Sequence, residues 1–252
     1  MYYSVLIVGK PGACKTTSSG SILREAQQNG FRPLFDSDRI RLENRVMQDT
    51  EHGKLMHDQT IVGKHSILID GTKPPGRKVF QVTDGILLNE EHDKMVRIAM
   101  THKNNEGVIL EYALGNDTHF QAAPDHPLLQ SGESLVRRLS QFRVGEDRRV
   151  VVLEVEAGFG VRIERNGVRF DGMNPDTIDA FFRDGCELQD YKNRLPKGVT
   201  YHYIDNNPDG VDELVRKLEK FHTEVLRPVL EECREARDAE GRPASTHDRG
   251  RR

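Results

Sequence analysis

Five short runs rich in apolar residues recur along this sequence, and longer amphipathic stretches separate them. The runs are residues 5–8, 32–35, 108–110, 149–155 and 199–204. They are continuous rather than strictly alternating, which is typical of strands that a sheet buries on both faces. The segments between or after them, 15–28, 39–48, 86–103, 134–142 and 211–235, have the composition or period of helices. Strand and helix therefore alternate, which predicts an α/β fold.

The segment from residue 48 to residue 84 is less regular than the rest of the chain. Its apolar runs 66–69 and 79–82 predict two short strands or a hairpin-like excursion. The three histidines in the segment lack the spacing of a helical metal pair, and their polar setting indicates exposed loops; they are His52, His57 and His65. The lysines of the loop from Thr72 to Lys78 could touch an anionic acceptor, but a solvated loop is the simpler interpretation.

Composition narrows the class of protein. The chain has 252 residues, of which 36% are hydrophobic and 31% charged, as expected of one α/β domain with an insertion. No apolar run is long enough to span a membrane, and the N-terminus lacks the charged region of a secretory signal. Cys14, Cys186 and Cys233 are too few for a disulfide framework, so we expect a reducing cytoplasm. The net charge of −3 gives no electrostatic case for nucleic acid.

The stretch from Tyr2 to Thr17, YYSVLIVGKPGACKTT, is the strongest candidate for a functional site. It matches the phosphate-binding pattern G-x-x-x-x-G-K-S/T at Gly9, Lys15 and Thr16, but Cys14 replaces the second glycine. A strand that turns tightly into a helix aims several backbone N–H groups at one point, which suits phosphate. The ordinary alternative is a glycine-rich turn without a ligand. The Cys14 side chain could crowd a phosphate, or point away if the backbone there is helical.

Two acidic positions follow predicted strands, where a parallel sheet collects its ligands. Asp36, with Ser37 and Asp38, follows the second strand, and Glu111 follows the third. An acid in either place could accept a proton from an acceptor hydroxyl or help to hold Mg²⁺. The simpler alternatives are that Asp36 or Ser37 caps the next helix and that Glu111 pairs locally.

Three arginines near residue 165 share one side of a predicted helix. Arg162, Arg165 and Arg169 are three and four positions apart, so an anion between them would relieve their repulsion. The alternative is a solvated basic face. The polar stretch 170–197 after them predicts a mobile helical lid, and residues 115–132 predict a loop over the site.

Together these segments resemble the P-loop nucleoside/nucleotide kinase family, the adenylate-kinase-like P-loop kinases, without matching one subfamily. Gly9–Thr17 looks like the family's G-x-P-G-x-G-K-T-T, and Val108–Ala113 like its strand that ends in an acid. Arg162–Arg169 resembles the R-x-x-R-N-x-x-R start of a lid, and Ile204–Asn207 the loop that passes the adenine. Asp36–Asp38 lies where members keep an acid after the second strand. The resemblance covers residues 1–226 and leaves the acceptor open.

The resemblance implies a three-layer α/β fold, in which helices flank a five-stranded parallel sheet and a helical lid covers the site. It divides the chain into a kinase domain, 1–235, and a disordered tail, 236–252; a lid at about 160–197 and an acceptor-binding insertion at about 40–104 belong to the domain. The implied activity moves the γ-phosphate of ATP, with Mg²⁺, to a small-molecule acceptor that could be a nucleoside or nucleotide.

The implied roles are as follows. The catalytic candidates are Lys15, Asp36, Glu111, Arg162 and Arg165. The nucleotide-binding candidates are Gly9, Pro11, Gly12, Ala13, Cys14, Lys15, Thr16, Thr17 and Asn206, and Thr16 is also the metal ligand. Two other functions stay open. One is a nucleotide-binding regulator that has lost catalysis, and the other is a polynucleotide 5′-kinase, which the acidic balance opposes.

Overall fold

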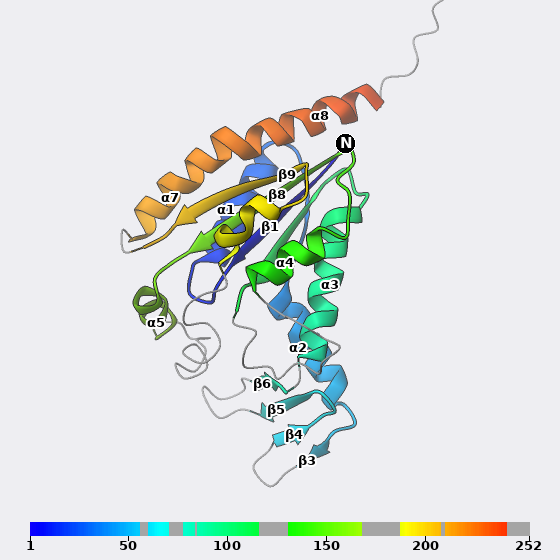
Figure 1. Cartoon of the computed structure of the whole chain (residues 1–252), viewed down its shortest axis with the longest axis vertical. Coiled ribbons are helices and arrows are strands. Elements are labelled where there is room, and N and C mark those ends of the chain that lie inside the picture. The colour runs from blue at the N-terminus through cyan, green and yellow to red at the C-terminus, as the bar shows by residue number, and fades with distance from the viewer. Residues whose placement is uncertain are drawn as a thin grey trace, which may run out of the picture.

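A five-stranded parallel sheet forms the centre of the molecule (Figure 1). The structure is a computed structural model that describes residues 1–55, 60–70, 78–83, 85–115, 131–167, 187–207 and 210–240. Across the sheet the strands are β2 (Leu34–Ser37), β7 (Val108–Ala113), β1 (Tyr2–Gly9), β8 (Arg148–Glu156) and β9 (Val199–Asp205). Every neighbouring pair is parallel, so the predicted five-stranded parallel sheet is confirmed.

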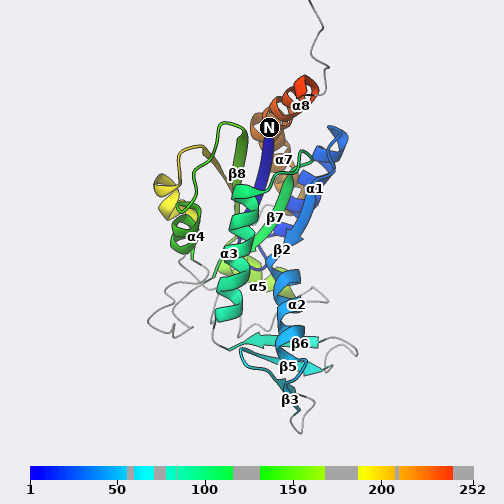
Figure 2. The same cartoon turned by 90° about the vertical axis from the view of Figure 1, so that its right-hand side faces the viewer.

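Helices cover both faces of this sheet, as predicted, and successive side chains of the central strand β1 enter different cores. Along β1, Tyr3, Val5 and Ile7 lie in one core, and Leu6 and Val8 lie in the other. The first core is closed by α1 (Lys15–Gln28), α7 (Gly210–Phe221) and α8 (Arg227–Glu240). The second is closed by α3 (Ile86–Thr101), α4 (Gly132–Leu139) and the 3₁₀ helix η2 (Leu188–Arg194). Figure 2 shows α3 and α4 on the opposite side of the sheet from α1 and α7.

Local signals explain some of the helix boundaries. The helix α2 (Asp38–Thr50) begins where the Ser37 hydroxyl accepts a hydrogen bond from the Ile40 amide at 3.3 Å, so of the two capping alternatives, Asp36 and Ser37, the structure shows Ser37. At the other end of the chain, a π-helical turn, η3 (His222–Leu226), joins α7 to α8 just before Pro228. Pro228 therefore falls in the first turn of α8, where a missing N–H is tolerated. The short helix α5 (Phe159–Gly167) follows β8.

A second, antiparallel sheet lies beyond the ends of α2 and α3 (Figure 1). Its strands are β3 (Lys54–Leu55), β4 (Thr60–Val62), β5 (Ser66–Asp70) and β6 (Lys78–Val82), paired in that order. A small core made by Leu42, Val46, Leu68, Leu87 and Leu88 joins the sheet to the two helices. The sequence pattern predicted two short strands here and missed β3 and β4, which are too short to show an alternating pattern.

Two predicted boundaries differ from those in the structure. The end of the predicted lid, η2, packs against α4, and Leu188 is fully buried in the core, so these residues belong to the body of the domain. The helix α8 continues to Glu240, although the predicted tail begins at Ala236. Outside the described residues lie 56–59, 71–77, 116–130, 168–186 and 241–252, and with them His57, Arg169, Cys186 and most of the predicted loop from Thr72 to Lys78. None of the helices in the described ranges has the length and apolarity needed to cross a membrane.

Candidate phosphate-binding site

The loop from Gly9 to Cys14 connects β1 to α1 at the carboxyl edge of the parallel sheet. Gly9 has φ 153°, and a Cβ there would lie 2.2 Å from the carbonyl oxygen of Val155. Gly12 has φ 83°, and a Cβ there would lie 2.8 Å from the carbonyl oxygen of Arg162. Both positions therefore require glycine, for backbone conformation and for space. The neighbouring α5 backbone packs directly on the loop.

Cys14 adopts the conformation that the pattern normally reserves for glycine. Its φ of 72° and ψ of 32° are left-handed, and it is the only described non-glycine residue with positive φ. The sequence left open a helical backbone at this position, and the structure excludes it. A left-handed L-residue costs about 1–2 kcal/mol. The thiol is directed at Arg165, whose Nη1 lies 3.7 Å from Sγ.

Lys15 and Thr16 begin α1 and face the loop and the neighbouring strand. Lys15 Nζ donates to the carbonyl oxygens of Gly9, at 2.7 Å, and Lys10, at 3.2 Å. Thr16 Oγ1 donates to Glu111 Oε2 at 3.3 Å, and the Ser19 hydroxyl donates to the other oxygen of Glu111. Glu111 reaches the loop because it is paired with Ile7 in the β1–β7 register. The structure therefore brings these three predicted residues together, with Ser19 as an addition that the pattern did not single out.

The other nucleotide-binding candidates lie on or beside the same loop. Ala13 is buried and donates its amide to the carbonyl oxygen of Lys10, whereas Thr17 is exposed on α1. Pro11 is half-buried between Lys10 and Gly12. Asn206 follows β9 and donates Nδ2 to the carbonyl oxygen of Ala13 at 3.2 Å, so the last strand also contacts the loop.

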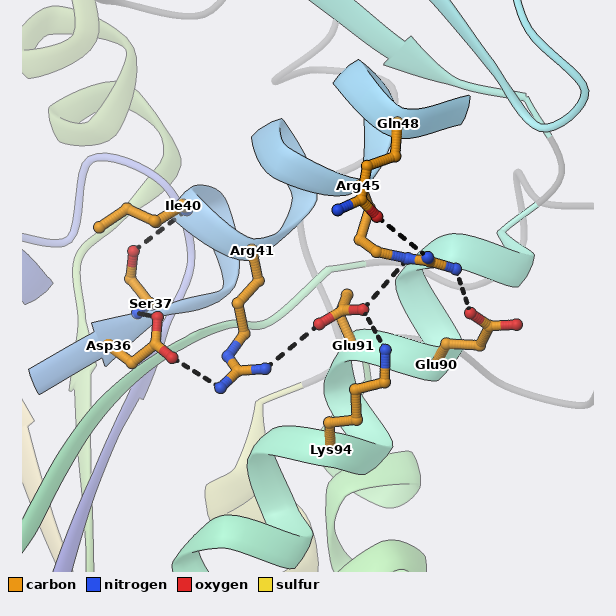
Figure 3. Close-up of polar contacts among 9 residues, drawn as sticks. All are labelled: Asp36, Ser37, Ile40, Arg41, Arg45, Gln48, Glu90, Glu91 and Lys94. Atoms are coloured by element: carbon orange, nitrogen blue, oxygen red, sulfur yellow. Dashed lines mark hydrogen bonds and ion pairs between the residues drawn. The ribbon is translucent and has the colours of Figure 1, made fainter. Parts of the chain in front are cut away.

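The Asp36 side chain takes part in a polar network between α2 and α3 (Figure 3). Its Oδ2 lies 2.7 Å from Arg41 Nη2, and Arg41 also pairs with Glu91. The same network contains Arg45, Glu90 and Lys94, so that three cations balance three carboxylates. Asp36 therefore forms an ion pair with Arg41 and does not contact Lys15 in this arrangement.

Asp38, two residues further on, is the acid that lies near the loop. It is 5% exposed, and its Oδ2 accepts the Ala113 amide at 2.5 Å and lies 3.5 Å from Nε2 of His92. Burial by itself would raise the pKa of Asp38, but His92, Lys15 and the Ala113 amide outweigh it and lower that pKa. The sequence placed Asp38 after the second strand but could not rank it above Asp36, because the choice depends on which side chain α2 turns toward the loop.

The two described arginines of the predicted cluster both contact the loop, but in different ways. Arg162 is 1% exposed, and its Nε donates to the carbonyl oxygen of Ala157 at 2.8 Å. Its side chain is therefore held by the end of β8, and its backbone packs against Gly12 of the loop. Arg165 is half-buried, lies beside Cys14, and donates Nη2 to the carbonyl oxygen of Asn206 at 3.1 Å.

A buried ion cluster behind the loop was not predicted. Lys10 is 1% exposed, donates to Glu187, and lies 3.8 Å from Glu156 Oε1. Glu156 lies 3.8 Å from Arg162 as well, and burial raises the pKa of its carboxyl to about 7 against the pull of both cations. A hint was available in the sequence, because Glu154 and Glu156 follow the apolar run of residues 150–153.

The donor atoms beside Lys15 fit a magnesium ion better than a softer metal. The Thr16 hydroxyl and the Glu111 carboxylate are oxygen donors 3.3 Å apart. Mg²⁺ in nucleotide sites takes only one or two protein ligands and completes its shell with water and phosphate oxygens. The described residues contain no group of three or more acidic, histidine or cysteine side chains that would make a protein-only metal cage.

Comparisons with known proteins leave the function to be argued from this site. No protein-family model matches the sequence, and no curated protein sequence matches it. Among solved structures, an unliganded sugar kinase from Janibacter sp. HTCC2649 is 11% identical, with TM-score 0.45 over 88% of this chain and 94% of that one. A protein from Chloroflexus aurantiacus, provisionally named a kinase, is 12% identical, with TM-score 0.40 over 87% of this chain and 97% of that one. At these TM-scores the likeness carries no argument about activity.

Proposed function

We propose that this protein is an ATP-dependent phosphotransferase that moves the γ-phosphate to a small-molecule acceptor. The observation that carries the proposal is the meeting of Lys15, Thr16 and Glu111 where β1 turns into α1. A nucleoside triphosphate with Mg²⁺ needs a cation for its phosphates and oxygen ligands for the metal, and a lysine, a hydroxyl and a carboxylate at a helix N-terminus supply them. A cytoplasmic location, where both are abundant, belongs to the same proposal.

Each residue has a distinct role in the proposal. Lys15 leaves the loop carbonyls to which it is bonded and contacts the β- and γ-phosphates, while the loop amides hold the phosphate chain. Thr16 and Glu111 hold Mg²⁺, which offsets the charge of the transferring group when it is bound. Arg165 stabilises the transferring phosphoryl group, and Arg162 fixes the loop through its contact with Gly12.

The proton acceptor is Asp38 in this proposal, in place of Asp36. Asp38 lies near Lys15, and Lys15 contributes to lowering its pKa. Asp36 is paired with Arg41 instead, with 2.7 Å between Oδ2 and Nη2. The acceptor itself is expected to lie between the sheet edge and the insertion that carries α2, the antiparallel sheet and α3.

The substitution Lys15→Ala tests the proposal. Loss of one electrostatic contact to a transferring group costs about 100-fold or more in rate, so turnover of MgATP with a panel of acceptors should fall by at least that factor. Lys220→Ala is a matched control, because the Lys220 side chain is 68% exposed on α7 and away from the loop. Turnover that persists unchanged in Lys15→Ala would contradict the assignment of the site.

A regulator that binds nucleotide without transferring phosphate is the second candidate, and the left-handed Cys14 favours it. Thermal unfolding with and without MgATP separates the two functions. A ligand at 100 times its dissociation constant stabilises by about 2.7 kcal/mol. Stabilisation without phosphate transfer to any acceptor would favour the regulator, and stabilisation with transfer would favour the enzyme.

A further inference from the structure

One strand end supports three separate contacts at the candidate site. In β7, Glu111 accepts hydrogen bonds from Thr16 and Ser19 of α1, and the amide of Ala113 donates to Asp38. Between them, the ring of Tyr112 stacks on His92 with 4.0 Å between ring centres and 29° between planes. Consecutive residues of a strand point to opposite faces, so Tyr112 holds the imidazole on the side of the sheet covered by α3.

His92 is fully buried on α3, and its Nε2 lies 3.5 Å from Asp38 Oδ2. At 3.5 Å, the interaction of His92 Nε2 with Asp38 is a longer polar contact rather than a hydrogen bond. The stacked Tyr112 ring fixes the plane of the imidazole, and the plane fixes the direction in which Nε2 points. Three elements therefore converge on Asp38: α3 through His92, β7 through the Ala113 amide, and α1 through the charge of Lys15.

We propose that His92 is a positioning residue, which holds the Asp38 carboxylate ionised and oriented to accept the proton of the acceptor hydroxyl. This inference rests on the proposed phosphotransferase function. The contacts of both His92 and Ala113 fall on Oδ2, which leaves Oδ1 as the oxygen that accepts the proton. His92 itself does not touch the substrate.

The chemical step balances with these groups. The acceptor oxygen forms a bond to the γ-phosphorus while the bond from that phosphorus to the β,γ-bridging oxygen breaks. The bridging oxygen leaves with the electron pair as part of ADP, and the hydroxyl proton passes to Oδ1 of Asp38. No oxidant or further reactant is needed. An Asp38 carboxylate that rotated away from the site would leave the proton without an acceptor at the moment of transfer.

The other two acids near the site do not have this freedom. Both oxygens of Glu111 accept hydrogen bonds from α1, through Thr16 and Ser19. Asp36 is paired with Arg41 and accepts the Ser37 amide at 2.8 Å. Asp38 is thus the described carboxylate at this sheet edge that combines a fixed oxygen with a second oxygen available for a proton.

The test replaces His92 and measures more than activity. His92→Phe keeps a ring stacked on Tyr112 but removes the N–H, and His92→Gln keeps an N–H donor without the ring. We expect kcat of His92→Phe to fall by about 10-fold or more while KM for MgATP stays the same, because orientation is lost but nucleotide contacts are not. His92→Gln should recover part of the loss. His102→Phe, which changes the histidine that follows the last residue of α3, should behave like the wild type.

The pH profile gives the second readout. His92 contributes to lowering the pKa of Asp38, so His92→Phe should raise that pKa and move the acidic limb of the kcat profile to higher pH. Unchanged kcat and an unchanged acidic limb in a folded His92→Phe would overturn the inference and leave His92 as packing only.

A separate measurement distinguishes failure of the inference from failure of the proposed function. The Asp38 carboxyl can be titrated by ¹³C NMR in the wild type and in His92→Phe without any acceptor. A higher titration midpoint in the variant supports the His92–Asp38 contact, and equal midpoints refute it. A wild type that binds MgATP but transfers phosphate to no acceptor refutes the proposed function, and the catalytic role of Asp38 with it.

Discussion

Replacing Cys14 with glycine should stabilise the protein, because it relieves a strained backbone at the candidate ligand site. Cys14 has φ 72° and ψ 32°, and this left-handed backbone costs an L-residue about 1–2 kcal/mol. Glycine removes that cost, but it also gives the unfolded chain more conformational freedom. This freedom lowers the free energy of unfolding by about 0.5–1 kcal/mol. The thiol contact to Arg165 is 3.7 Å long and weak, and Arg165 keeps the Asn206 carbonyl as a partner.

Taking the middle of both ranges, the expected net gain in the free energy of unfolding is about 0.75 kcal/mol. In a domain of this size it corresponds to a rise in Tm of about 1–4 °C. Urea denaturation at constant slope measures the gain directly, as a shift in the midpoint. If the cysteine side chain also crowds the phosphates, Cys14→Gly will tighten MgATP binding in addition.

Two control variants separate the backbone from the thiol. Cys14→Ala removes the sulfur but keeps a Cβ and therefore keeps the strain, so it should not be more stable than the wild type. Cys14→Val adds a branched side chain, which the left-handed region disfavours strongly, and should be less stable. The strain argument is refuted if the alanine variant gains as much stability as the glycine variant, or if the glycine variant gains none.

Three further substitutions test the acids near this edge of the sheet. The pKa of Glu156 in the folded protein is about 7, above its ordinary 4.5, so its contribution to stability is full below the ordinary value and is lost as the pH rises through 7. In the wild type, the free energy of unfolding should therefore fall by about 3 kcal/mol between about pH 5 and pH 7.5. Glu156→Gln should flatten this fall, which urea titrations at several pH values measure. An equal fall in both proteins would show that other groups cause the pH dependence. For catalysis, Asp38→Asn should lower kcat by about 100-fold or more, whereas Asp36→Asn should act mainly on stability through its lost pair with Arg41. The opposite ranking of the two variants in a phosphate-transfer assay would return the catalytic role to Asp36.

Local sequence was sufficient to predict the main layers. The buried runs that became β1, β7 and β8 have few polar residues, so they have no place except between two layers of helices. The helix α1 occupies the predicted residues, Lys15–Gln28, because a tight loop precedes it and Asn29-Gly30 ends it. A cap of α2 by Ser37 could also be considered from the sequence, since a cap depends on residues only three positions apart.

The sequence could not show which of the neighbouring acids, Asp36 or Asp38, lies near the loop. Asp36 and Asp38 are two positions apart after the same strand, and the sequence treats them alike. Arg41 pairs with Asp36, whereas His92 and the Ala113 amide contact Asp38. These partners lie on different elements, and their approach depends on how α2 and α3 pack.

Position 14 shows the same division. The sequence established that a cysteine stands in a phosphate-loop pattern, and only the backbone revealed that it takes the left-handed conformation of the missing glycine. The loop must turn from β1 into α1 within a few residues, while the backbone of α5 presses against Gly12. That turn is set by the packing of three elements, so the cysteine takes whatever conformation the turn requires. Sequence patterns thus determined the elements and the type of loop, whereas long-range contacts decided which side chains face it, because such contacts join residues that are remote in the chain.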